Sequence, residues 1–231
     1  MTVLAFDTAT SSCAIAIWRN GEVIAQVQKD LERGHAEVLV PMIEGVLAEA
    51  KITYQDLDLL AVTIGPGAFT GIRIGLATAR SLALAIKLPL IGITNFKALA
   101  YARPQSERAG RKSLIVLETK RADFYVCLYD EDLTLLSEPK AVDAIGLQAF
   151  AGIGPLLLLG DAAERALPLL DVAGRDVTAP ISGRYVEPVT VAQLAEDIIN
   201  SGVAFSSPSP LYIKPPDVNM SGVLIPPRIF T

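Results

Sequence analysis

The fold is decided by residues 59–75, which read LLAVTIGPGAFTGIRIG. The apolar run at 59–64 predicts a buried strand, and the residues from about 70 to 87 predict a helix. A glycine-rich loop between a strand and a helix start can present backbone N–H groups to an anion. The loop lacks the Lys-Ser/Thr of a P-loop and the glycine spacing of a dinucleotide-binding turn. The stretch therefore predicts an α/β domain without a standard nucleotide-binding motif.

The predicted helix gives the glycines a second explanation. Gly71, Gly75 and Ala79 lie at i, i+4 and i+8, where they form a stripe along which another helix can approach closely. The other sides of this helix are also apolar, so it needs cover on more than one side. We interpret the stripe as partner-facing. Packing in the domain's own core and ligand binding are the two alternatives.

The regions on both sides of this stretch complete an α/β unit. Apolar runs at 3–7 and 13–18 and the alternation at 22–28 predict three strands, and Asn20-Gly21 predicts a tight hairpin between the last two. A helix is predicted over 35–51, with Pro41 at a first turn or kink. A strand at 89–93 and a helix from about 95 follow. The predicted order is βββαβαβα.

The second half repeats this outline, which predicts a duplicated α/β fold with two mixed sheets and a cleft between them. Strands are predicted at 113–118, 123–129, 133–136 and 156–159, and helices around 162–170 and 190–201, after a weaker one. The predicted organisation is a first domain at 1–102, a polar linker at 103–112, a second domain at 113–204 and a proline-rich extended tail at 205–231.

Composition excludes several kinds of site. The 231 residues include one histidine, His35, so sites that need two imidazoles are excluded. The two cysteines, Cys13 and Cys127, lack metal-ligand spacing and indicate buried thiols in a reducing compartment. We see neither a signal peptide nor an uninterrupted apolar span of about 18 residues, and expect a cytoplasmic protein that does not enter the membrane. The hydrophobic share of 51% exceeds what a lone soluble chain usually needs.

Three further features have both a structural and a functional interpretation. The segment Asp7-Thr8-Ala9-Thr10-Ser11-Ser12 either holds a metal-bound phosphate or satisfies its own backbone as a turn. For His35, near a helix start, a structural or interface role outweighs catalysis. The stretch 103–121 is the one local candidate for nucleic-acid contact, although a solvated loop and strand edge is the favoured interpretation. Its cations are Arg103, Arg108, Arg111, Lys112, Lys120 and Arg121.

Four segments together resemble the TsaB (YeaZ) family. They are L-A-x-D-T-A-T-x-x-C-x-x-A at 4–16, R-G-H-A-E-x-L-x-P-M-I at 33–43, G-P-G-x-F-T-G-x-R-I-G-x-A at 65–77 and P-L-Y-I-K-P-P-D-V at 210–218. The resemblance is close over residues 1–100 and thin over 130–205. It implies the actin/hexokinase/Hsp70-type (ASKHA) duplicated fold. It also implies a non-catalytic scaffold in bacterial synthesis of N6-threonylcarbamoyladenosine at position 37 of tRNA (t6A37).

In that family the partner is the catalytic paralogue TsaD, and the ATPase TsaE joins the pair. The resemblance implies that ATP, ADP and metal are held by TsaD and TsaE, that this chain has no cofactor of its own, and that tRNA is contacted only through the complex. Without TsaD we expect a homodimer through the same helices, 35–51 and 70–87. The residues expected at this interface are His35, Leu39, Met42, Ile43, Val46, Gly71, Ile72, Gly75, Leu76, Ala79 and Leu82.

Two loops complete the expected site. Asp7, Thr8, Thr10 and Ser11 are expected to form a vestigial phosphate loop. The competing hypothesis is a phosphotransferase that uses Asp7 and the cleft. It is disfavoured because the turn at 118–123 lacks the glycine of active second phosphate loops. A metalloprotease is disfavoured because the chain has a single histidine. The residues assigned to the glycine-rich loop are Gly65, Pro66, Gly67, Phe69, Thr70 and Arg73.

Overall fold

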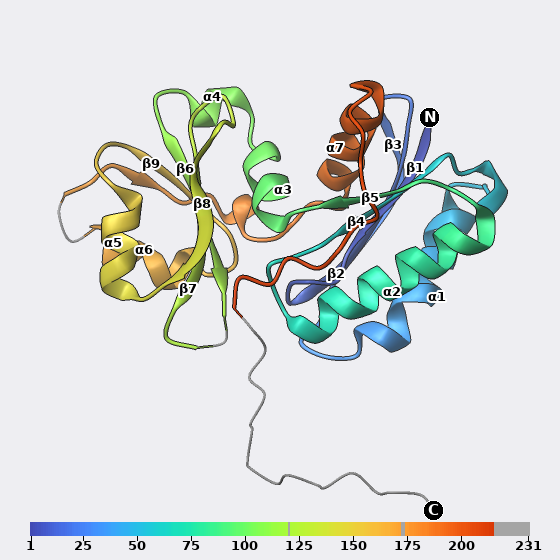
Figure 1. Ribbon diagram of the computed structural model, residues 1–231, viewed down its shortest axis with the longest axis horizontal. Helices are drawn as coiled ribbons and strands as arrows, with labels where there is room; N and C mark the ends of the chain where they lie inside the picture. The colour runs from blue at the N-terminus through green and yellow to red at the C-terminus, as the bar shows by residue number, and fades with distance from the viewer. Residues whose placement is uncertain (120, 172–173, 215–231) are drawn as a thin grey trace, which may run out of the picture.

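The computed structural model describes residues 1–119, 121–171 and 174–214. Two five-stranded mixed sheets stand side by side, with helices between them and on their outer faces (Figure 1). The predicted duplicated α/β fold is confirmed. The strand orders are β3-β2-β1-β4-β5 and β8-β7-β6-β9-β10, so the second sheet repeats the topology of the first.

The first sheet begins with an antiparallel meander and continues with two parallel strands. Alternation along β1 divides its buried side chains between two cores, because neighbours in a strand point to opposite faces. Leu4 and Phe6 belong to the core under α1 and α2, whereas Val3 and Ala5 belong to the core between the sheets. The elements are β1 (Thr2–Asp7), β2 (Ser12–Arg19), β3 (Glu22–Asp30), α1 (His35–Glu49), a 3-10 turn η1 (Tyr54–Asp56), β4 (Leu59–Thr63), α2 (Phe69–Ile86), β5 (Leu90–Ile93) and α3 (Asn95–Tyr101).

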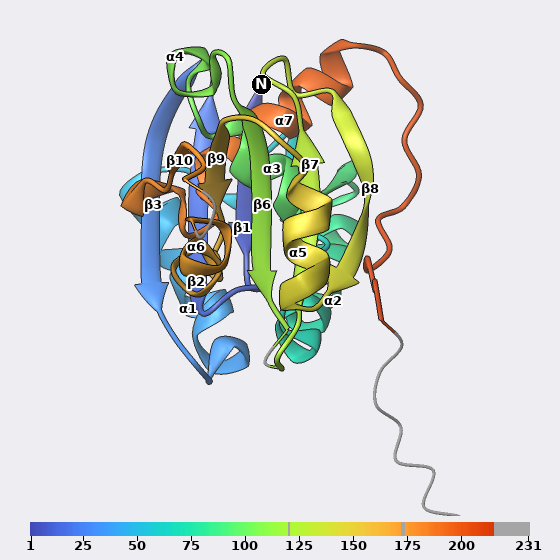
Figure 2. The same ribbon diagram turned by 90° about the vertical axis from the view of Figure 1, so that its left-hand side faces the viewer.

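The second sheet carries α5 and α6 on its outer face, where Figure 2 shows them in front of the strands. Its outer core includes Leu114, Val116, Leu156 and Leu158. The run of four leucines predicted as a strand is β9, and all four side chains are buried. The elements are α4 (Gln105–Arg108), β6 (Lys112–Glu118), β7 (Phe124–Tyr129), β8 (Leu135–Val142), α5 (Ala144–Ala151), β9 (Leu156–Leu159), α6 (Ala163–Asp171), β10 (Val177–Thr178), a 3-10 turn η2 (Ile181–Gly183) and α7 (Pro188–Asn200).

Helix α7 lies with the first sheet, not the second. It packs on β1 and β2 and against α3, and its Val191 and Leu194 enter the core that the two sheets share. The indole Nε1–H of Trp18 in β2 donates to Glu196 Oε2 at 2.6 Å. The predicted second domain at 113–204 is therefore wrong at its end, because the apolar face of α7 matches the inner face of the first sheet.

The described part of the tail is extended, as predicted, and crosses from α7 to the gap between the domains (Figure 1). Pro208 packs against Gly92, where an added Cβ would lie 2.5 Å from the proline Cβ. Leu211 N donates to Ile64 O at 2.8 Å, and Lys214 pairs with Asp123 of the second domain. Residues 215–231 of the predicted tail lie outside the described residues.

One helix of the described residues, α2, is long and apolar enough to cross a membrane by length and composition alone. The prediction that no such span exists is therefore wrong by this criterion, because Arg73 and Arg80, the two cations within the helix, do not lower its mean hydropathy enough. In the structure α2 packs on β4 and beside α1, as a helix that covers a sheet does.

Candidate functional site: the cleft and the loops at its mouth

The carboxylate of Asp7, at the end of β1, is fully buried and enclosed by donors. Thr63 Oγ1 donates to Oδ1 at 2.5 Å, Thr10 Oγ1 donates to Oδ2 at 2.8 Å, and Ala9 N donates to Oδ1 at 3.1 Å. Asn95 Nδ2 completes the set at 3.4 Å. Burial raises the pKa of Asp7, and these hydrogen bonds oppose the rise. The hydrogen-bonding capacity of the Asp7 carboxylate is thus taken up by groups of the protein itself.

Sequence reasoning missed Thr63 and Asn95. The signal was their position directly at or after the carboxyl ends of β4 and β5, because such ends converge at one edge of a sheet. Of the predicted phosphate loop, Thr8 and Thr10 are buried and Ser11 is partly exposed. Thr8 Oγ1 donates to Gly71 O at 2.8 Å, so this hydroxyl also joins the β1–β2 turn to the start of α2.

The second domain contributes another carboxylate to the cleft. Asp161, after β9, accepts a hydrogen bond from Glu118 N at 2.9 Å. Burial, together with the charge of Glu118, raises the pKa of Asp161 to about 6. Glu118 itself is paired with Arg165, whose Nε and Nη2 contact both carboxylate oxygens.

The cleft between these carboxylates is almost closed. The cavity lined by residues 9–11, 66–68, 117–118 and Asp161 has a volume of about 20 Å³. That is room for roughly one water molecule. The glycine-rich loop closes it, because Ala68 N donates to Ala9 O at 2.7 Å and an added Cβ on Gly67 would lie 2.1 Å from the same oxygen. The glycines allow the loop to pack on the β1–β2 turn.

The glycine stripe on α2 faces the chain's own core. An added Cβ would lie 2.0 Å from Thr8 O at Gly71 and 2.4 Å from Thr8 Oγ1 at Gly75, and Ala79 is fully buried. The prediction that this stripe faces a partner is therefore wrong, because the sheet and the β1–β2 turn occupy that side. Among the predicted interface residues, Met42 and Leu82 are partly exposed, and those buried in the first domain are His35, Leu39, Ile43, Val46, Gly71, Ile72, Gly75, Leu76 and Ala79.

The uncovered faces of α1 and α2 are mostly apolar or small. The two helices lie side by side on the outer face of the first sheet (Figure 1). Leu84 is 83% exposed and Val40 is 44% exposed. Further exposed small or apolar residues are Pro41, Gly45 and Ala48 of α1 and Ala77, Ser81 and Ala85 of α2.

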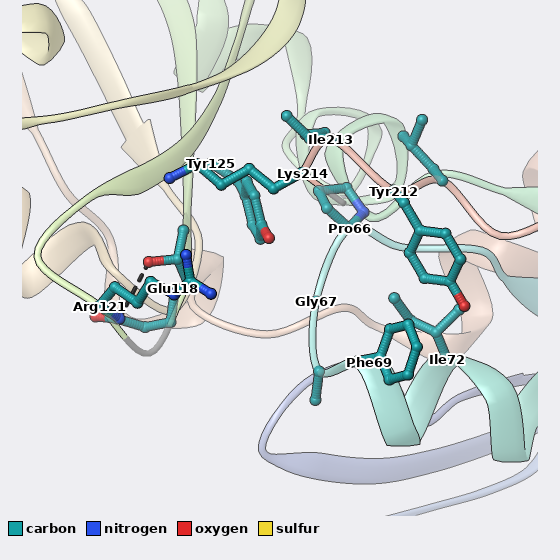
Figure 3. Close-up of a pocket in the computed structure, with 13 residues that line it drawn as sticks. Pro66, Gly67, Phe69, Ile72, Glu118, Arg121, Tyr125, Tyr212, Ile213 and Lys214 are labelled. Carbon is teal, nitrogen blue, oxygen red and sulfur yellow. Dashed lines mark hydrogen bonds between the residues drawn. The ribbon is translucent and has the colours of Figure 1, made fainter. Parts of the chain in front are cut away.

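A cavity of about 350 Å³ opens where the glycine-rich loop, the β6–β7 turn and the tail meet (Figure 3). Pro66, Phe69 and Ile72 form one side, and Glu118 and Tyr125 lie opposite. The tail closes a third side through residues 211–214.

The contribution of the tail to this cavity was not visible in the sequence. Arg73 lies over the Phe69 ring at 3.7 Å and donates from Nε to the hydroxyl of Tyr212 at 3.1 Å. Gly65 and Pro66 of the loop are buried, whereas Phe69, Thr70 and Arg73 are exposed. The first residues of the loop, Gly65 and Pro66, therefore pack inside the protein, whereas Phe69, Thr70 and Arg73 lie at its surface.

The predicted basic stretch is largely engaged within the chain. Arg103 is buried and pairs with Glu187 at 2.5 Å, and Arg111 pairs with Asp176 at 2.9 Å. Arg108 donates to the backbone of Glu131, and Lys112 Nζ donates to Ile153 O at 3.2 Å. Lys120 lies outside the described residues. These contacts favour the structural interpretation of the stretch.

Within the described ranges no group of three or more His, Cys, Asp or Glu side chains could hold a metal ion. Both cysteines are buried, and burial raises the pKa of Cys13 and of Cys127 to about 11. Thiols with such pKa values are poor nucleophiles.

Two α/β domains that repeat one mixed-sheet topology define the class as the actin/hexokinase type of duplicated domain. The same fold is found in YeaZ from Pseudomonas aeruginosa, with a TM-score of 0.74 and 21% identity over 91% of this chain and 100% of that one. It is also found in the activator of 2-hydroxyisocaproyl-CoA dehydratase from Clostridium difficile, solved with bound ADPNP, with a TM-score of 0.57 and 11% identity over 87% of this chain and 97% of that one.

The sequence comparisons narrow this class. The family model described as "TsaD: tRNA N6-adenosine threonylcarbamoyltransferase" matches residues 23–167. The tRNA threonylcarbamoyladenosine biosynthesis protein TsaB of Escherichia coli is 34% identical over 132 residues, which are 57% of this chain and 56% of that protein. The chain thus matches little more than half the length of this curated relative. The chain belongs to the family of t6A biosynthesis proteins that this model describes, and within it to the TsaB (YeaZ) branch.

Proposed function

We propose that the chain is a non-catalytic scaffold and activator subunit in t6A37 synthesis, and that it pairs with a TsaD-type catalytic paralogue. The observation that carries the proposal is the outer face of α1 and α2, which no described residue covers and which is mainly apolar or small. A face of this kind is typical of a protein–protein interaction site. Small side chains also let a partner helix approach closely.

The non-catalytic role is supported by the cleft. Asp7 has its oxygens occupied by Thr63, Thr10, Ala9 and Asn95, and the neighbouring cavity holds about 20 Å³. A ligand of nucleotide size needs a pocket of roughly 300 Å³ or more. The cavity of about 350 Å³ beside the tail is large enough, but neither Asp7 nor Asp161 lines it. These observations disfavour the alternative, a phosphotransferase that binds Mg-ATP through Asp7. Micromolar binding of Mg-ATP by the isolated chain in calorimetry would favour that alternative.

The remaining parts of the proposal follow from family membership. We propose that ATP, ADP and metal are held by TsaD and TsaE, that TsaE joins the pair, and that tRNA is contacted through the complex. The protein would work in the cytoplasm. In the absence of TsaD, the same uncovered helix face would support a homodimer, since the same apolar surface is then available to a second copy.

The proposal is tested by mixing the purified chain with the TsaD-type protein of the same genome, with and without TsaE and ATP, and measuring co-elution. Ala77→Glu and Leu84→Glu place a charge on the uncovered face and are expected to weaken association at least tenfold. Ile145→Glu changes an equally exposed apolar residue, 80% exposed on α5, and is expected to leave association unchanged. Absence of association in every mixture, or equal losses in all three variants, would contradict the proposal.

A further inference from the structure

The described end of the tail runs from the first domain to the second. Residues 201–207, which follow α7, are exposed, whereas Pro208 is buried and begins a series of contacts that ends at Lys214. We call residues 208–214 the strap. Figure 2 shows the tail passing down one side of the molecule, and Figure 1 shows it entering between the two domains. The strap is thus anchored along its length, unlike the exposed segment before it.

The beginning of the strap is fitted into the first domain. Arg80 Nη2 of α2 donates to Pro208 O at 2.5 Å. Gly92 in β5 leaves room for the proline ring, since an added Cβ would lie 2.5 Å from Pro208 Cβ. Leu211 N then donates to Ile64 O, next to the end of β4, at 2.8 Å. These contacts fix the strap to α2, β4 and β5.

Tyr212 fixes the strap to the start of α2. Its ring centroid lies 5.2 Å from that of Phe69, and its hydroxyl accepts a hydrogen bond from Arg73 Nε at 3.1 Å. The Arg73 guanidinium also lies over the Phe69 ring, at 3.7 Å from its centroid. A cation above an aromatic face is attracted by the ring. The three side chains therefore hold one another in place beside the glycine-rich loop.

The strap ends on the second domain, at the β6–β7 turn. Lys214 pairs with Asp123, and its side chain points from the strap toward that domain (Figure 3). Asp123 is oriented by Thr119 Oγ1, which donates to its Oδ1 at 2.7 Å. The side chain of Asp123 is 15% exposed, so salt screens this ion pair less than one between fully exposed groups. The ion pair thus connects the strap to an oriented carboxylate of the second domain.

The shared core and the strap join the two domains at different places. The core between the sheets includes residues of α3 and α7, and the strap lies below these helices in Figure 1. Here the glycine-rich loop and the β6–β7 turn line opposite sides of the cavity of about 350 Å³ (Figure 3). Domains that are joined at one side by a packed core can rotate about it. A connection across the other side therefore limits how far they open.

We propose that the strap holds the two domains in the closed arrangement, and that the ion pair of Lys214 and Asp123 is its releasable clasp. With the clasp intact, the β6–β7 turn stays near the glycine-rich loop. Residues 66–68 and Glu118 line both the cavity beside the tail and the cleft of about 20 Å³, so the clasp also keeps the cleft closed. Without it, a more open form of the protein gains population. This inference concerns the isolated chain and does not depend on its association with TsaD.

The test measures a distance between the domains near the strap. Spin labels are attached at Thr70→Cys, at the start of α2, and at Ala144→Cys, at the start of α5, because both positions are exposed. Val142 pairs with Phe124, so the label at 144 follows the part of β8 that lies beside the β6–β7 turn. The native cysteines are fully buried, so the introduced ones are labelled selectively. Pulsed electron paramagnetic resonance is expected to give one main distance population.

Variants at both ends of the strap are then compared. Lys214→Gln is expected to raise the share of molecules at longer distances at least about threefold, as loss of a partly exposed ion pair allows. The charge swap Lys214→Asp with Asp123→Lys is expected to restore the original distribution. Arg80→Gln loosens the other end of the strap and is expected to act like Lys214→Gln.

A matched control and a folding check complete the test. Lys29→Gln removes an exposed cation from β3, at the opposite edge of the first sheet from β5, and is expected to change nothing. Unchanged emission of Trp18, in the shared core, shows that each variant is folded. An unchanged distribution in Lys214→Gln would overturn the proposal. So would a broadening that the charge swap leaves in place, or one that Lys29→Gln produces equally.

Discussion

Thr8 and Gly71 hold the glycine-rich segment against the first strand. Thr8 Oγ1 donates to Gly71 O at 2.8 Å, and a Cβ on Gly71 would lie 2.0 Å from Thr8 O. The close approach of α2 to the β1–β2 turn therefore depends on the absence of a side chain. The conspicuous glycines of this sequence are explained by packing inside one chain.

Substitution of these glycines is expected to destabilise the fold. Gly71→Ala and Gly75→Leu place atoms within 2.4 Å of Thr8, and overpacking of this kind costs roughly 1–3 kcal/mol or more of unfolding free energy. The measurement is urea unfolding. Gly45→Ala is the control, because Gly45 is exposed in the middle of α1 and has no atom near its Cβ position; it is expected to stabilise by about 0.5–1 kcal/mol. Unchanged stability in Gly71→Ala would contradict this account.

Asp161→Asn is expected to stabilise the protein at neutral pH. A carboxyl whose folded pKa is about 6, above an unfolded value of 3.8, binds protons more strongly in the fold. Its contribution to stability is therefore fully present below pH 3.8 and is lost as the pH rises to about 6. The amide oxygen of Asn can still accept from Glu118 N.

The measurement is the melting temperature at pH 7.5 and at pH 4.5. The melting temperature of Asp161→Asn is expected to exceed that of the wild type at pH 7.5. This difference should shrink at pH 4.5, where the wild-type side chain is mostly protonated. Asp132→Asn, in an exposed turn, controls for the general loss of one negative charge. A gain of equal size at both pH values would show that titration of Asp161 is not its source.

Arg103→Ala is expected to reduce stability, because it removes a buried cation with two partners. Arg103 donates to Ser182 Oγ at 2.7 Å and pairs with Glu187 at 2.5 Å. The loss should be roughly 1–3 kcal/mol in urea unfolding. Arg111→Ala removes a more exposed ion pair, the one with Asp176, and should lower the free energy of unfolding by about 0–1 kcal/mol. If Arg103→Ala instead weakened RNA binding without loss of stability, this result would support nucleic-acid contact by residues 103–121.

Leu194→Ala is expected to destabilise the first domain, although this residue follows the second domain in the sequence. Leu194 is 3% exposed in the core between the sheets, and such truncations cost roughly 2–5 kcal/mol. Trp18, the single tryptophan, packs in the same core and reports the change through a red shift of its emission near the unfolding transition. A fragment of residues 1–112 that folds cooperatively with native Trp18 emission would contradict the dependence on α7.

The element order of the first domain, the duplication and the family are predictable from the sequence, whereas α4 and β10 of the second half were not predicted. Local patterns sufficed: alternation marks β3, the Asn20-Gly21 pair marks its hairpin, and the glycine-rich stretch carries the resemblance. Each of these signals lies within a few neighbouring residues, so no tertiary contact is needed to detect it.

Which side of each helix is covered depends on contacts between distant residues that the fold brings together. The stripe of Gly71, Gly75 and Ala79 has the spacing of a helix-packing surface, but its occupant is Thr8, more than sixty positions away in the chain. Likewise α7 returns to the first sheet, and residues 211–214 return to the cavity beside the glycine-rich loop. Periodicity shows that a face is apolar, whereas the fold decides what packs on it, because contacts between residues distant in the chain depend on topology.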